Sequence, residues 1–285
     1  MNPPNISLLL IDALRQIEAA PVAHERTGNE LEDSTKAAFV DALYIPEEGV
    51  FTGAEGRKQT IGKGKRISDE DRGAYLDALK GVIDFLNTGT CTSTAAKTAF
   101  IKHPLGKQNW PEFALYHHGK VLPIEVKSSK DGRITWNGGL PRLDCLYIYY
   151  YTHKKCTDRR CTFFFGEDII NAATIGRLKE GHRRIQEFAA SVHAEMFPEP
   201  GSNMGFAEYV RAMFTHNEKI HGHAKRHLWK AKATLRVAEW GDAKATTLKP
   251  LRDDVKNETR WLAEEERKRT SERDGAATAK KRRKR

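Results

Sequence analysis

Apolar residues near the start of the chain recur with the spacing of an amphipathic helix. The stripe consists of Ile6, Leu9, Leu10, Leu14 and Ile17. It predicts a helix over residues 5–20 that stops at Pro21. A second stripe predicts another helix from about Leu31 to Leu43. Residues 1–45 are therefore expected to form an N-terminal helical layer.

The spacing changes in the middle of the chain. After a loop rich in glycine and lysine and one further helix, apolar residues alternate with polar or small ones at Phe113, Leu115, Leu122, Ile124 and Val126. This alternation predicts half-buried strands. The stretches Leu143–Tyr151 and Cys161–Phe165 are rich in aromatic and β-branched residues and predict two more strands. We expect a core over residues 46–170 that combines the loop with a central sheet.

Helical spacing returns after Asp168. One face collects Ile175, Leu178, Ile185, Phe188 and Val192, which predicts a helical part over residues 171–263. From Glu264 onward apolar residues nearly vanish, so a disordered basic tail is expected over residues 264–285.

Composition narrows the class of protein. Hydrophobic residues make up 39% of the 285 positions and charged residues 30%, as in an ordinary soluble chain with one large domain or a core plus an appendage. No apolar run approaches the roughly 20 residues that cross a bilayer, and the N-terminus lacks the features of a secretory signal. We expect an intracellular protein with no membrane partner.

The cysteines are too few and too unevenly spaced for a disulfide framework, so we expect reduced thiols. They are Cys91, Cys145, Cys156 and Cys161. Cys156 and Cys161 with His153 resemble part of a zinc site, but a structural zinc ion needs four ligands and none nearby completes the set.

Net charge favours a polyanionic partner only mildly. The formal charge is +10, but all six residues from Lys280 to Arg285 are basic, and removing those six charges leaves +4. The tail fits a nuclear localisation signal or nonspecific attraction to DNA. The basic segment His216–Arg236 fits a helix lying on phosphates or, equally, a surface helix whose apolar edge packs inward.

Candidate chemistry lies at Glu112, Glu125 and Lys127 in the central sheet. If Gly119 and Lys120 form the two-residue turn of a hairpin, Glu112 lies opposite Lys127 and Ala114 opposite Glu125. Glu125 and Lys127 then share one face, because side chains alternate along a strand. Two carboxylates and an ammonium group are expected to converge at the open end of the hairpin.

Two carboxylates suit a hard divalent cation such as Mg²⁺, which keeps several waters and also binds phosphate. The metal can activate a water, and Lys127 could orient that water or stabilise a pentacoordinate phosphate. The alternative is a solvated cross-strand salt bridge on an exposed sheet face, because a Glu-x-Lys tripeptide is common.

The residues around this triad resemble type II restriction endonucleases of the PD-(D/E)xK nuclease superfamily. His103–Phe113 resembles the run before the first acidic ligand, Pro123–Lys130 resembles the ExK strand, and Trp136–Pro141 with Tyr147–Tyr149 resembles the segment that follows. The resemblance covers residues 100–170 well and the rest weakly.

This resemblance implies an α/β fold with a central mixed sheet flanked by helices, to which the apolar spacing after Asp168 adds a helical C-terminal part. It implies sequence-specific cleavage of double-stranded DNA with Mg²⁺, for which Mn²⁺ substitutes, leaving a 5′-phosphate. It further implies a homodimer in the cytoplasm of a prokaryote, with a cognate DNA methyltransferase as genetic partner.

Carried over by position, Glu112 and Glu125 become metal ligands, the Val126 carbonyl a third, and Lys127 the water-positioning base. Glu112 departs from the family, which normally has Asp there, so weak activity is an open alternative. Glu32 resembles a helix-start glutamate that points toward the metal in some of these nucleases. It equally fits an acidic first turn favoured by the helix dipole.

Polar and aromatic residues flanking the triad are candidate DNA contacts in loops, able to bind phosphates or base edges. They are Lys107, Gln108, Asn109, Lys130, Arg133, Trp136, Asn137 and Arg142. Each alone equally fits a solvated loop residue. Two other functions stay open: a DNA repair or junction nuclease with the same core, and a DNA-binding protein on a degenerate nuclease scaffold.

Overall fold

The structure is a computed structural model of the chain. It describes residues 5–20, 28–46, 49–53, 69–107, 109–137, 139–153, 161–199, 213–216, 218–220 and 222–283.

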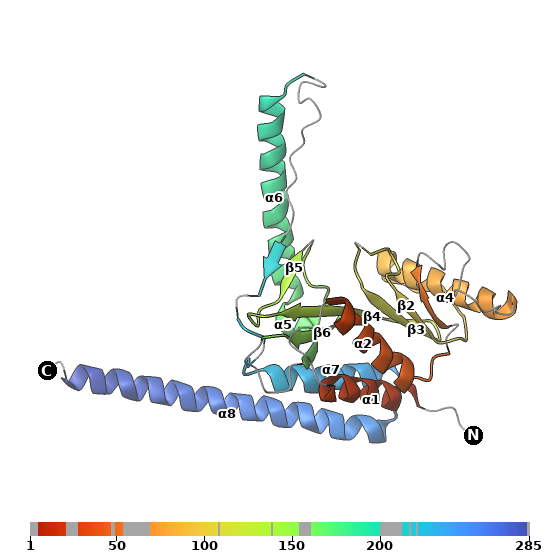
Figure 1. Cartoon of the computed structure of the whole chain (residues 1–285). Helices are drawn as coiled ribbons and strands as arrows, with labels where there is room; N and C mark the ends of the chain where they lie inside the picture. Colours follow the sequence, from red (N-terminus) through yellow and green to blue (C-terminus); the bar gives the residue numbers. More distant parts are fainter. Residues whose placement is uncertain are drawn as a thin grey trace.

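A mixed six-stranded sheet forms the centre of the described part of the chain (Figure 1). Its strands, in spatial order, are β1 (Val50–Thr52), β2 (Ala99–Lys102), β3 (Phe113–His117), β4 (Lys120–Ser129), β6 (Leu146–Tyr151) and β7 (Cys161–Phe165). The pairs β1–β2 and β4–β6 are parallel and the others antiparallel. The predicted strands are confirmed, and β1 and β2 are additions that the apolar pattern did not reveal.

Helices cover both faces of this sheet. On one face, α1 (Ile6–Ala19) and α2 (Gly28–Ala42) pack with α7 (Arg226–Trp240) over a core that includes Phe39 and Phe113. On the other face, α4 (Asp69–Thr88) packs Tyr75 and Leu79 against Tyr116. The two predicted N-terminal helices are present, and the α/β class with a mixed sheet flanked by helices is confirmed.

The register of the hairpin β3–β4 differs from the predicted one by two residues. The turn consists of His118 and Gly119, with φ of 45° and 76°, the positive values at both positions that a type I′ hairpin turn requires. His117 therefore pairs with Lys120 and Phe113 with Ile124. Continued by one residue, this register sets Glu112 opposite Glu125, so the predicted pairing with Lys127 is wrong. A shift of two residues leaves every side chain on its predicted face.

An appendage projects from the body. The short α5 (Gly166–Ile169) leads into α6 (Ala172–Met196), which extends outward (Figure 1). At its base, β5 (Thr135–Asn137) and β8 (Met213–Thr215) form a two-stranded antiparallel sheet. None of the described α6 residues is buried, and Phe188 is 69% exposed. The predicted apolar stripe is therefore real but packs on no core.

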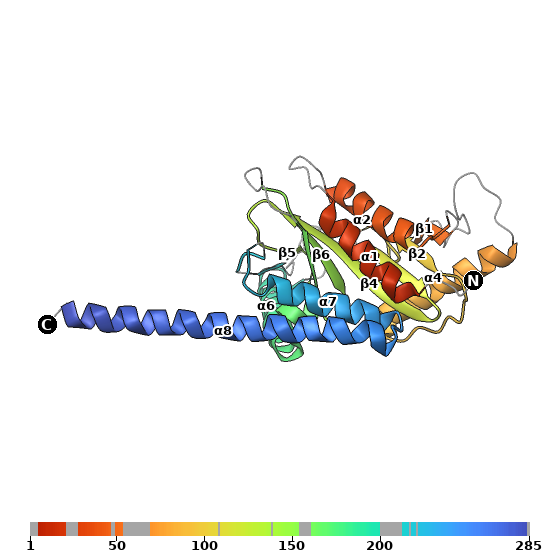
Figure 2. The same ribbon diagram turned by 90° about the horizontal axis from the view of Figure 1, so that it is seen from below.

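The last described element, α8 (Ala245–Arg283), lies beside α7 and then runs past the body (Figure 2). The predicted disorder from residue 264 is thus wrong for residues 264–283. A helix without an apolar face forms when its residues are good helix formers and charges pair one turn apart. Lys268 and Glu265 make one such pair, at 3.0 Å.

No described helix has both the length and the apolar character to cross a membrane.

Candidate active site

The hairpin β3–β4 brings the three predicted residues together. Glu112 immediately precedes β3, and Glu125 and Lys127 lie two residues apart in β4. Ile124 and Val126 alternate with them and point into the core under α1 and α2. The period of the strand thus separates a core face from a face that carries the charges.

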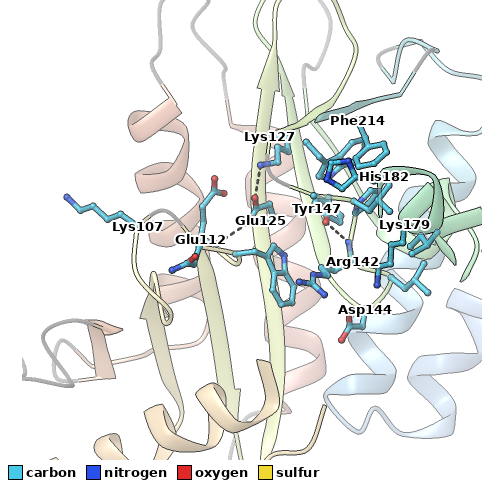
Figure 3. Close-up of a pocket in the computed structure, with 18 residues that line it drawn as sticks. Lys107, Glu112, Glu125, Lys127, Arg142, Asp144, Tyr147, Lys179, His182 and Phe214 are labelled. Atoms are coloured by element: carbon cyan, nitrogen blue, oxygen red, sulfur yellow. Dashed lines mark hydrogen bonds and ion pairs between the residues drawn. The ribbon is translucent and has the colours of Figure 1, made fainter. Parts of the chain in front are cut away.

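Three hydrogen bonds hold the triad in place, two of them between residues drawn in Figure 3. The Glu112 backbone N–H donates to Glu125 Oε2 at 3.1 Å, and the Val126 backbone N–H donates to the Glu112 carboxylate. Lys127 Nζ donates to Glu125 Oε1 at 2.6 Å. Each carboxylate therefore holds the backbone of the other strand, which fixes both strands at the open end of the hairpin.

Burial separates this cluster from an ordinary surface ion pair. Glu125 is only 8% exposed, and the side chains of Glu125 and Lys127 are 11% and 22% exposed. Surface pairs keep most of their hydration, whereas these groups have lost it. The alternative of a solvated salt bridge on an exposed sheet face is contradicted for this pair.

The electrostatics of the cluster favour a bound cation. Burial, followed by repulsion from Glu125, raises the pKa of Glu112 to about 8. Burial opposes the charge of Lys127, but attraction from Glu125 and then Glu112 outweighs it and raises the pKa of Lys127. One ammonium group therefore does not compensate two neighbouring carboxylates. A divalent cation would supply the missing positive charge.

The donor set fits Mg²⁺ better than a soft metal. Glu112 and Glu125 offer hard oxygen ligands, as Mg²⁺ prefers, and Mg²⁺ keeps several waters where a protein supplies few ligands. Within the described residues, no group of three or more His, Cys, Asp or Glu side chains is placed to hold a metal ion. The Val126 carbonyl as a third ligand stays a prediction.

Glu32 lies near the triad but is held by a lysine. Lys102 Nζ, at the end of β2, is 3.2 Å from Glu32 Oε2 and 3.7 Å from an Asp33 oxygen. The charge of Glu32 still contributes to raising the pKa of Glu112. Glu32 therefore acts on the site through its field, while direct ligation stays a prediction.

A cleft of about 670 Å³ opens beside Glu112, Glu125 and Lys127 (Figure 3). Its lining also includes Lys107, Asn109, Trp110, Trp136, Arg142, Asp144 and Tyr147, and from the appendage Ile175, Lys179, His182 and Phe214. Sequence reasoning missed Trp110, Asp144, Tyr147 and the appendage residues. No local signal identifies the appendage residues, because α6 and β8 reach the cleft only through the tertiary fold.

Four predicted DNA contacts line this cleft: Lys107, Asn109, Trp136 and Arg142. The guanidinium carbon of Arg142 lies 5.2 Å from the centre of the Trp110 ring. Lys130 and Arg133 are exposed and outside the lining.

The prediction of an exposed loop is wrong for Trp136. It lies in β5, is only 7% exposed, and packs edge-on against Tyr147 with ring centres 5.9 Å apart. A large aromatic residue stabilises a small two-stranded sheet by packing on the body. Asn137 also belongs to β5, but its side chain lies outside the described residues, as does Gln108.

The basic helix α7 is a packed element of the body. Trp229 is 3% exposed, Lys230 pairs with Glu18 of α1, and Arg236 pairs with Glu167. Lys232 is 3.4 Å from Asp168. These observations favour the packed helix over a helix lying on phosphates, because carboxylates already neutralise three of its cations.

The zinc hypothesis involves Cys156, which lies outside the described residues. Of the other two candidates, Cys161 is buried in β7 and the His153 ring stacks on Tyr151. Neither observation favours a metal site.

Comparison of the chain with family models, curated proteins and solved structures finds no match.

Proposed function

We propose that the chain is a Mg²⁺-dependent endonuclease that hydrolyses DNA phosphodiester bonds. One observation carries the proposal: a buried carboxylate, Glu125, and a partly buried one, Glu112, share a cleft wall with the ammonium group of Lys127. Three further cations, Lys107, Arg142 and Lys179, line the same cleft. A cation site beside groups that attract a polyanion is the combination that phosphodiester hydrolysis requires.

The residues divide the work as follows. Glu112 and Glu125 would hold Mg²⁺, which when bound supplies positive charge to the phosphate and an acidified water. Lys127, fixed by Glu125 at 2.6 Å, orients the attacking water and stabilises negative charge that develops on the phosphate oxygens. Lys107 and Arg142 bind phosphates of the DNA strand that is cut.

The finer proposal is a sequence-specific type II restriction enzyme that cuts double-stranded DNA as a homodimer. It depends on the resemblance of residues 100–170 to that family. The mixed sheet with helices on both faces and the position of Glu125 and Lys127 in an interior strand support it.

Purified chain incubated with mixed plasmid and genomic DNA tests the proposal. We expect Mg²⁺-dependent cleavage into discrete fragments with 5′-phosphate ends, and the same with Mn²⁺. Cleavage that follows DNA structure instead of sequence would replace the restriction enzyme by a repair or junction nuclease. Binding without any cleavage in either metal would contradict the enzymatic proposal.

A further inference from the structure

The wall of the cleft opposite the carboxylates comes from the appendage. Lys179 and His182 of α6 and Phe214 of β8 face Glu125 and Lys127 across the cleft (Figure 3). Helix α6 contributes no buried residue to the body in the part of the chain that the structure describes. The base of α6 therefore lines the cleft but does not pack into the core.

Charge on this wall is available to a ligand. Among the described residues, neither Lys179 nor Lys107 has a carboxylate within ion-pair distance, although both line the cleft. By contrast, the neighbouring α6 cations Arg183 and Arg184 both pair with Glu180, at 2.7 Å and 2.9 Å. Lys179, on the wall opposite the carboxylates, is therefore an uncompensated cation that can bind a phosphate next to the bond that is cut.

Aromatic rings on the walls are also available. The His182 and Phe214 rings lie edge to face with centres 6.5 Å apart, and both are only partly buried. Trp110 also lines the cleft and is partly buried, with the Arg142 guanidinium over its ring. Faces of paired bases are hidden inside a duplex, whereas an unpaired strand offers every base face to such rings. Cations alternating with half-exposed aromatics therefore match an unpaired strand better than a continuous duplex.

We propose that this cleft binds an unpaired stretch of DNA, with at least one unstacked base against His182 and Phe214 and an adjacent phosphate on Lys179. The proposal rests on the proposed function only in placing the scissile phosphate at Glu125 and Lys127. In the double-stranded site proposed above, the unpaired stretch would be a base extruded from the duplex; single strands, flaps and bulges offer the same unpaired base without the cost of extrusion.

Binding measured in EDTA separates this proposal from catalysis. Fluorescence anisotropy of a labelled oligodeoxynucleotide, alone or annealed to its complement, gives both affinities without cleavage. We expect the single strand to bind roughly tenfold more tightly than the duplex. Phe214→Ala should weaken single-strand binding by roughly tenfold and leave duplex binding unchanged. His182→Ala repeats the test without altering a strand residue, and circular dichroism checks that both variants fold.

Lys179→Ala should weaken binding and reduce the salt slope for the single strand by about 0.7, as expected for one lost phosphate contact. The matched control is Arg177→Ala, which removes the same charge from α6 outside the cleft lining and should leave binding unchanged. Equal affinity for duplex and single strand, or unchanged binding in folded Phe214→Ala and His182→Ala, would overturn the proposal. Selective single-strand binding without cleavage in Mg²⁺ would support it and contradict the proposed nuclease function.

Discussion

Replacing Glu112 by glutamine should stabilise the metal-free protein at high pH while removing its response to Mg²⁺. The pKa of Glu112 is raised from 4.5 to about 8 by burial and then by Glu125. The pKa of Glu112 is higher in the folded protein than in the unfolded chain. Between pH 4.5 and about 8, the folded protein therefore keeps a proton on Glu112 that the unfolded chain has lost. The stability from that proton is complete below pH 4.5 and is lost as pH rises through about 8.

The size of the effect follows from this pH window. One proton contributes about 1.4 kcal/mol per pH unit, so the window sets an upper limit of roughly 5 kcal/mol. Since Glu112 is partly accessible and interacts with Glu125, we expect about 2 kcal/mol, or a few degrees in melting temperature. The amide oxygen of the introduced glutamine would still accept the hydrogen bond from the Val126 N–H that the Glu112 carboxylate accepts now.

Urea unfolding of both proteins from pH 5 to 9 in EDTA, and again with Mg²⁺, is the assay. The variant should equal or fall below the parent at pH 5 and exceed it at pH 9. Mg²⁺ at tenfold excess over its Kd should stabilise only the parent, by about 1.4 kcal/mol. Two results together would contradict this prediction: the variant is destabilised equally at every pH, and Mg²⁺ does not change the stability of the parent. Glu112 would then have a purely structural role.

Four further outcomes are expected. Lys127→Ala should lower the single-turnover cleavage rate by at least about a hundredfold with DNA affinity nearly unchanged; equal loss of both would indicate a structural role. Glu112→Asp should lower the rate about tenfold or more, because the Glu112 carboxylate already spans to the Val126 amide and a shorter side chain would withdraw from it; a faster variant would contradict this. Trp136→Ala should destabilise the protein by about 3 kcal/mol in denaturant titration, as expected for a buried aromatic residue; a change in DNA affinity without loss of stability would restore it as a DNA contact. Lys230→Ala, at the partly buried ion pair with Glu18, should cost about 1 kcal/mol in stability and leave DNA affinity unchanged, whereas weakened binding would revive the phosphate role of α7.

Local periodicity was sufficient to predict the elements that build the triad. Alternation from Leu122 to Val126 predicted which side chains of β4 face the core, and that assignment holds in the structure. It holds although the turn lies one residue earlier than predicted, because this moves the pairing register by two residues and keeps each side chain on its face. The sequence alone does not distinguish a turn at His118 and Gly119 from one at Gly119 and Lys120, since glycine can occupy either central position of a two-residue turn.

Other features depend on contacts between distant segments. The apolar stripe of α6 looks like any core-facing helix, and only the fold reveals that it projects from the body. The sequence predicts a loop at Trp136, because its strand is only three residues long and pairs with a segment nearly eighty positions away. Lys179, His182 and Phe214 reach the cleft for the same reason, and no spacing near the triad could have indicated them.

The most direct test of the central claim is the Mg²⁺-dependent cleavage rate of Glu125→Gln beside that of the unaltered chain, with both purified identically. Glu125 is the residue that contacts both Lys127 and the Glu112 backbone, and glutamine is a close match in size without the charge. We predict cleavage by the unaltered chain and a loss of at least about a hundredfold in the variant, with its folded spectrum retained. Equal cleavage by both proteins would contradict the assignment of this site.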